Sequence, residues 1–139
     1  MATTAVYKSY PAAAAGISRA SSGTSAWTDS AWTEVVPTGS ISSTFYIAGV
    51  TTMYSNNAAV DTTHSVELEI GTGTAGGEVP IMTIPFNFRI DSAVGHQPII
   101  FLPIINPREV SGSARVAVRV RQSLATTTVT YNGIKIFYY

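Results

Sequence analysis

Strict alternation of apolar and polar side chains is the feature of this sequence that most restricts its fold. The segment 114–121, ARVAVRVR, has valine at 116, 118 and 120, in alternation with three arginines and one alanine. The segment 64–70, HSVELEI, repeats the pattern, with Glu67 and Glu69 between three apolar residues. A period of two puts successive side chains on opposite faces of a β-strand. Both segments therefore predict strands with one buried face and one polar face.

The composition agrees with a sheet protein. The 139 residues include 13 Val, 13 Ile and 18 Thr but only 3 Leu. Side chains branched at Cβ lose rotamer freedom on a helix and pack well on a pleated sheet. Further strands are expected at 31–36, 43–50, 79–90, 98–105, 126–131 and 134–139. We expect an all-β fold: an antiparallel, jelly-roll-like β-sandwich of about eight strands.

Three local features refine this expectation. Pro80 and Pro85 should interrupt a ladder or confine their strand to an edge, because proline cannot donate a backbone hydrogen bond. The nearly all-apolar segment 98–105, PIIFLPII, is typical of a strand covered on both faces. Asn132-Gly133 is typical of a hairpin turn and predicts that the chain reverses there.

The first 25 residues have a different texture. They contain Pro11, the alanines 12–15 and a Ser/Gly/Thr segment at 21–25, which together bury little and favour turns. We expect an extended N-terminal arm over residues 1–25, with a flexible terminus as the alternative. Residues 26–139 are expected to form the β-sandwich domain.

Charge and absent residue types exclude several classes of protein. Only 12% of residues are charged and the net charge is zero, so no broad basic surface for nucleic acid is expected. Cysteine is absent and the only histidines are His64 and His96, which excludes thiolate zinc and three-histidine sites within one chain. No apolar segment suits a signal peptide or a membrane span. We expect no cofactor and no membrane partner, and assembly in a cytoplasm.

Two motifs resemble catalytic or ligand sites but lack the required context. The segment 71–76 matches G-x-G-x-x-G, yet more strand pattern follows it instead of the helix that a dinucleotide site needs. We therefore expect an inter-strand loop. Asp61 and His64 lie near Glu67 and Glu69, a possible cation site, but a solvated or ion-paired strand face explains these residues better. No nucleophile with a base beside it can be named, so the chain is not expected to be an enzyme.

Arg115, Arg119 and Arg121 share one face of the alternating strand 114–121. Glu67 and Glu69 are candidate partners for them, within the chain or across a subunit interface, because arginine is favoured in desolvated pairs. The alternative is a solvated polar face. The low charge content of the rest of the chain favours pairing.

Aromatic residues offer a second kind of contact. Trp27, Trp32, Tyr46 and Tyr54 could line a platform for sugars, or they could anchor the core or a subunit interface. The sequence ends on aromatic residues within a predicted strand, which indicates packing in a sheet or against a neighbour. The predicted subunit interface consists of Trp27, Trp32, Arg115, Arg119, Arg121, Tyr138 and Tyr139.

Five motifs follow one another along the chain: WTEVV at 32–36, ELEIGTG at 67–73, FLP at 101–103, NP at 106–107 and GSARVAVR at 112–119. Their order resembles small β-sandwich virion proteins of tailed bacteriophages, of the decoration, head-fibre or tail-accessory type. The resemblance covers about residues 26–125 and departs from that pattern where Ser-Gly-Ser precedes Ala114, in place of a proline-glycine turn.

The resemblance implies a non-enzymatic virion protein that is assembled in the host cytoplasm and acts as an oligomer. A decoration or cement protein, or a head-fibre or collar component, is the first hypothesis. A tail-associated module that binds a receptor or glycan is the alternative. The expected partners are the chain itself and virion proteins such as the major capsid protein. A trimer is expected because jelly rolls often assemble that way, and a surface of zero net charge resists association poorly.

Overall fold

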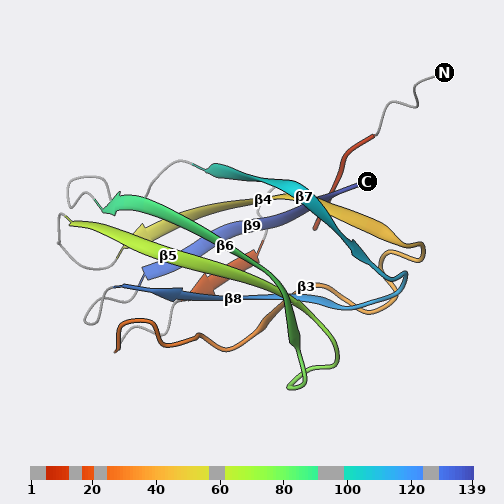
Figure 1. Cartoon of the computed structure of the whole chain (residues 1–139), viewed down its shortest axis with the longest axis horizontal. Coiled ribbons are helices and arrows are strands. Elements are labelled where there is room, and N and C mark those ends of the chain that lie inside the picture. The colour runs from red at the N-terminus through yellow and green to blue at the C-terminus, as the bar shows by residue number, and fades with distance from the viewer. Residues whose placement is uncertain (1–5, 13–16, 21–24, 57–61, 91–98, 124–128) are drawn as a thin grey trace.

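The computed structural model describes residues 6–12, 17–20, 25–56, 62–90, 99–123 and 129–139, and these contain nine strands and no helix (Figure 1). The strands are β1 (Lys8–Tyr10), β2 (Ile17–Ala20), β3 (Thr33–Val36), β4 (Phe45–Asn56), β5 (Thr62–Thr72), β6 (Val79–Ile90), β7 (Ile100–Val110), β8 (Val116–Gln122) and β9 (Val129–Tyr138). The all-β prediction is confirmed. The described residues include no helix that is long and apolar enough to cross a membrane.

The strands form two antiparallel sheets that pack as a sandwich. The first sheet has the order β1-β9-β4-β7, and β2 also pairs with β9. The second sheet has the order β3-β8-β5-β6. If β1 and β2 are taken together as one interrupted strand, this strand pairs with β9, the last strand of the chain. Moving inward along the sequence, β3 pairs with β8, β4 with β7 and β5 with β6. A long hairpin rolled up in this way is a jelly roll, which confirms the predicted fold class.

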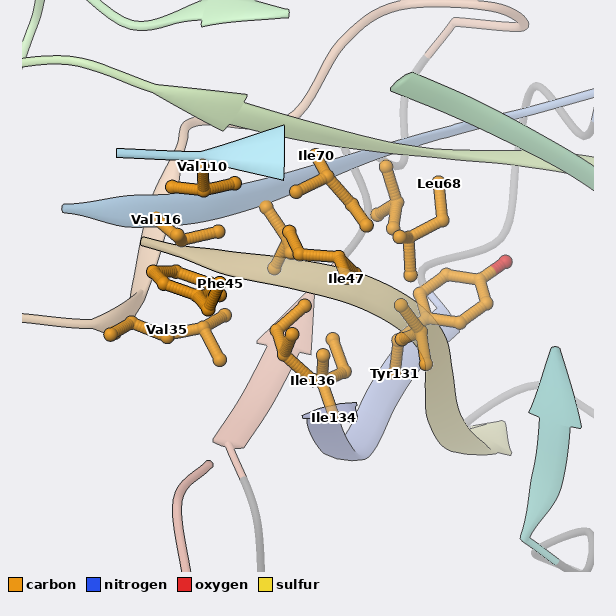
Figure 2. Close-up of a cluster of buried hydrophobic side chains, with 14 of the residues drawn as sticks. Val35, Phe45, Ile47, Leu68, Ile70, Val110, Val116, Tyr131, Ile134 and Ile136 are labelled. Carbon is orange, nitrogen blue, oxygen red and sulfur yellow. The ribbon is translucent and has the colours of Figure 1, made fainter. Parts of the chain in front are cut away.

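The core lies between the sheets and consists of the apolar halves of the alternating strands. Val66, Leu68 and Ile70 of β5 are fully buried, as the alternation predicted. Val116, Val118 and Val120 of β8 are buried in the same layer. Figure 2 shows side chains from both sheets meeting there, among them Phe45 and Ile47 of β4 and Ile134 and Ile136 of β9.

The predicted hairpin at Asn132-Gly133 is wrong, because β9 continues through these residues. Thr51 and Met53 of β4 oppose Lys135 and Asn132 of β9, so β9 holds one extra residue and forms a bulge. Gly133 has φ 63°, which glycine adopts without steric cost. The Thr51 hydroxyl donates to the Gly133 carbonyl at 3.2 Å. The dipeptide therefore bends a long strand instead of reversing it.

The sequence predicted that the apolar segment 98–105 is covered on both faces. This prediction is wrong for the described residues 99–105. The segment contributes to β7, which lies at an edge of the first sheet. Ile104 packs against the core, but Phe101 and Ile105 point outward and are 52% and 93% exposed. Pro103 and Pro107 lack the backbone N–H that an inner strand donates to both neighbours, and this suits an edge. β6, with Pro80 and Pro85, lies at the edge of the other sheet, as predicted.

The segment expected to form an arm contributes β1 and β2, which both pair with β9. Tyr10 packs against the core cluster, and its hydroxyl donates to the Ser40 side chain at 3.2 Å. The division of the chain into an arm and a domain at residue 26 stays a prediction.

Val118→Asp should unfold the domain, because the new carboxylate would lie without a partner at a position that is 0% exposed. Burial of an unpaired charge costs several kcal/mol, roughly the whole stability of a small domain. The matched control is Val79→Asp, at a position 63% exposed, which should change stability by less than about 0.5 kcal/mol. Thermal unfolding followed by circular dichroism measures both. Equal melting temperatures for the two variants would contradict the assigned faces of β8.

Candidate functional site

The outer face of the second sheet carries a ladder of arginine–carboxylate pairs. Glu67 lies opposite Arg121, and Glu69 lies opposite Arg119, in the antiparallel register of β5 and β8. The Nε atoms of Arg121 and Arg119 donate to Oε2 of these glutamates, each at 2.5 Å. Asp29 adds a second carboxylate to Arg119 at 2.9 Å. The predicted pairing of the arginines thus occurs within one chain, because period-two strands place the opposite charges side by side.

Arg115 continues the ladder toward the loop between β5 and β6. Its Nε donates to Glu34 of β3 and its Nη1 donates to Glu78 of the loop, both at 2.7 Å. Gly71 and Thr72 of the segment 71–76 still belong to β5, and residues 73–76 lie in the loop between β5 and β6, so the predicted inter-strand loop is confirmed for these four residues. Burial alone would raise the pKa of Glu78, but hydrogen bonds from backbone N–H groups and from Arg115 outweigh it and lower that pKa.

Trp32 covers the middle of the ladder. The guanidinium of Arg119 lies 4.7 Å from the centroid of the Trp32 ring, within the range of a cation–π contact. The far edge of the indole lies on Gly71, where a Cβ atom would come within 2.7 Å of Trp32 Cη2. The absence of a side chain at Gly71 therefore leaves room for this edge of the indole. Trp32 thus packs on the outer face of its own sheet, against Arg119 and Gly71.

The ladder is net acidic. Its members are three arginines and five carboxylates, which gives the face a net charge of −2. Glu67 and Glu69 are occupied by arginines, and Asp61 and the His64 side chain lie outside the described residues. Among the described side chains no group of three or more His, Asp or Glu residues could hold a metal ion.

The outer face of the first sheet is different, because it is largely aromatic and aliphatic. Tyr139 stacks on Tyr46 with ring centroids 5.6 Å apart, and Tyr7 meets Tyr139 edge-on at 5.5 Å. Phe101 meets Phe137 edge-on at 5.4 Å. We call these five residues, together with Ile105, the aromatic face.

A hollow of about 430 Å³ lies in the aromatic face, lined by Tyr7, Ala48, Phe101, Pro103, Ile105 and Phe137 among others. Ile105 stands beside it and is 93% exposed. At the margin, the Tyr46 hydroxyl donates to Glu109 at 2.5 Å. This hydrogen bond raises the pKa of Tyr46, because ionisation would put two negative charges together. The face thus joins a broad apolar centre to a polar rim.

The residues predicted to form one subunit interface lie on both sheets. Trp27, Trp32 and the three arginines belong to the outer face of the second sheet. Tyr139 belongs to the aromatic face of the first sheet. Tyr138 packs inward, edge-on to Phe45 at 5.4 Å. Their role at an interface stays a prediction.

The aromatics weighed as a sugar platform do not come together. Trp27 and Trp32 belong to the second sheet's outer face, whereas Tyr46 belongs to the first sheet's outer face. The side chain of Tyr54 lies outside the described residues. The sequence did not single out Phe101 or Ile105, and it indicated Phe137 as part of the aromatic C-terminal segment. The signal for Phe101 and Ile105 was the segment 98–105, which is apolar at both strand parities although only one parity faces the core.

No protein-family model matches the chain, and no curated protein matches it. Among solved structures, a chain titled "Desmodium yellow mottle tymovirus" matches at 12% identity with a TM-score of 0.33, covering 99% of this chain and 90% of that one. A chain from the structure of infectious bursal disease virus, Gx strain, matches at 15% identity with a TM-score of 0.27, covering 96% of this chain and 42% of that one. Both TM-scores are low, so the fold assignment rests on this chain's own strand order and register.

Arg119→Ala should destabilise the fold by about 1–3 kcal/mol, because it leaves the carboxylate of Glu69, which is 7% exposed, without its cationic partner. This exceeds the about 0–1 kcal/mol expected for a solvated arginine. Urea unfolding of both single variants and of Arg119→Ala/Glu69→Ala measures the coupling. The double variant should lose less than the sum of the two single losses, and additive losses would contradict a coupled pair.

The contact between Glu78 and Arg115 should make stability depend on acid. A carboxyl whose pKa is lower in the folded state stabilises the fold above its unfolded pKa, about 4.3, and this contribution is lost as the pH falls through the folded value. Melting temperatures of the natural chain and of Glu78→Gln should therefore differ most at neutral pH and converge in acid. A difference that stays constant from neutral to acid pH would show that ionised Glu78 does not stabilise the fold.

Proposed function

We propose that this chain is a non-enzymatic structural protein of a bacteriophage virion, most directly a capsid decoration or cement protein or a head-fibre or collar component. The observation that carries the proposal is the aromatic face. Tyr7, Phe101 and Ile105 are 62%, 52% and 93% exposed although they are large and apolar. Contiguous apolar surface with a polar rim is typical of protein–protein contacts. The order of strand motifs that resembles phage β-sandwich proteins supports a virion as the setting.

The extent of the aromatic face supports contact as its role. A large aromatic side chain carries about 150–250 Å² of surface, so the exposed parts of the four partly exposed rings and of Ile105 come to roughly 500 Å². That is more than half of the ~800 Å² that each partner buries in a stable interface of standard size. Polar residues at the margin, such as Glu109, can supply the rest of the contact.

The proposed partners are further copies of the chain and a virion protein such as the major capsid protein. A trimer is the expected homo-oligomer. Tyr139 lies within the aromatic face and is part of the proposed contact, whereas Tyr138 packs inward against the core. A second contact through Trp27, Trp32 and the three arginines of the opposite face remains a separate prediction.

Ile105→Asp should weaken self-association without unfolding the chain. The side chain is 93% exposed, so the fold gives up little when it is replaced, but an interface would have to bury the new carboxylate. The association constant should fall by at least about tenfold, the effect of 1.4 kcal/mol. Sedimentation velocity over a range of concentrations measures it.

The matched control is Val79→Asp, which makes the same chemical change at an exposed position beside the loop between β5 and β6. It should associate as the natural chain does. A natural chain that stays monomeric at high concentration and does not bind phage particles would overturn the proposed function. Equal association of Ile105→Asp and the natural chain would remove the aromatic face from the contact.

A further inference from the structure

A second hollow lies on the outer face of the other sheet, beyond the end of the arginine ladder. It has a volume of about 430 Å³ and is lined by Trp27, Ser65, Glu67, Pro85, Phe86 and Asn87 among others. Glu67 and Ser65 of β5 lie directly opposite Pro85 and Asn87 of β6. Two adjacent cross-strand pairs thus form its floor, and Trp27 forms its wall. We call this site the Trp27 groove.

Trp27 is held in an unusual way for an exposed residue. Its φ is 60°, in the left-handed region that bulky residues rarely adopt. Its backbone N–H donates to the carbonyl of Gln122 at 2.7 Å, which ties this conformation to the end of β8. The side chain is nevertheless 46% exposed, so the conformation is not explained by burial of the indole in the core. Strained backbone that presents an exposed side chain is characteristic of binding sites.

The groups around the Trp27 groove define the chemistry of a ligand. The indole and Pro85 offer flat apolar surfaces. The exposed Asn87 carries an amide that both donates and accepts hydrogen bonds. The Glu67 carboxylate is already paired with Arg121, so together they offer donors and acceptors without a net charge. A ligand that fits has one apolar face and a rim of neutral hydroxyl groups.

We infer that the Trp27 groove binds a neutral pyranose sugar, such as a residue of a glycan. The C–H face of the ring stacks on the indole, and its hydroxyls reach Asn87 and the Glu67–Arg121 pair. The net charge of −2 on the surrounding ladder disfavours phosphates and acidic sugars. A quaternary ammonium group is the competing cation, but such groups are bound by cages of several aromatics. The groove offers one exposed aromatic ring, Trp27, because the side chain of Phe86 packs against the core.

The site is independent of the proposed contact through the aromatic face, because the two lie on outer faces of different sheets. A single sugar held by one indole and a few hydrogen bonds binds weakly. Several copies of the chain on one particle would raise the effective affinity by multivalency. Sugar binding and self-association can therefore be measured separately.

The experiment uses indole fluorescence, since the chain has two tryptophans. Trp32→Phe leaves Trp27 as the single reporter. Its emission should change on titration with the methyl glycosides of glucose, galactose or N-acetylglucosamine, but not with N-acetylneuraminic acid or choline chloride. Asn87→Ala should weaken the response by about tenfold, the effect of 1.4 kcal/mol. The matched control, Asn106→Ala, changes an exposed asparagine outside the groove and should leave the response unchanged.

Saturation-transfer NMR on the natural chain and on Asn87→Ala repeats the measurement without relying on the Trp32 variant. No signal from any neutral sugar in either experiment would overturn the inference, as would a response to choline instead. Trp27→Ala provides the last arm. A change in its sedimentation without loss of sugar signal would assign Trp27 to a subunit contact and also overturn the inference. Unchanged sedimentation with loss of the sugar signal would support it.

Discussion

The antiparallel register between β5 and β8 is the constraint on which the rest of the structure depends. It sets Ile70 opposite Val118 toward the core and Glu69 opposite Arg119 on the outer face. A slip of one residue would exchange the faces of β8, burying arginines and exposing valines. The same register therefore specifies both the apolar core and the ion-pair ladder. The core and the ladder both disfavour the other registers in which a strand of alternating valine and arginine could pair.

The ladder also concentrates half of the chain's charged side chains on one face. The sequence has sixteen Asp, Glu, Lys and Arg residues, and eight of them are paired on the outer face of one sheet, where they carry a net charge of −2. The other eight charged residues therefore carry +2, which brings the net charge of the chain to zero. Five of these eight lie on strands of the first sheet: Lys8, Arg19, Arg108, Glu109 and Lys135.

The parts of the fold that could be predicted are those that a single strand determines. The alternation in β5 and β8 assigned their faces correctly, because period two is a property of one segment. The local structure of Asn132-Gly133 could not be predicted from its own segment. Whether such a dipeptide reverses the chain or forms a bulge depends on the partner strand, and here β4 supplies Thr51 to bond the bulge carbonyl.

The candidate sites show the same limit. The pairing of Glu67 and Glu69 with arginines could be predicted, because the period-two alternation places all of these side chains on the polar faces of their strands. The aromatic face could not be predicted. The segment 98–105, PIIFLPII, is apolar at odd and even positions alike, so the sequence does not show which of the two sets faces the core. Trp27 and Tyr139, which were predicted from the sequence to share one interface, lie on the outer faces of different sheets. The assignment of strands to sheets cannot be predicted from the pattern of one segment. Trp27 also owes its position to a positive φ, which no residue pattern in its segment indicates.

The two outer faces suit different neighbours in an assembly. An oligomer that buries the aromatic face removes its exposed rings from water and leaves the opposite sheet free, because a sandwich separates its outer faces by the whole core. The ladder is neutralised mainly within the chain, so it does not need a partner to satisfy its arginines. The Trp27 groove beside it therefore stays open to solvent in such an assembly. A sandwich of this kind can be fixed to a particle by one sheet while it presents the other.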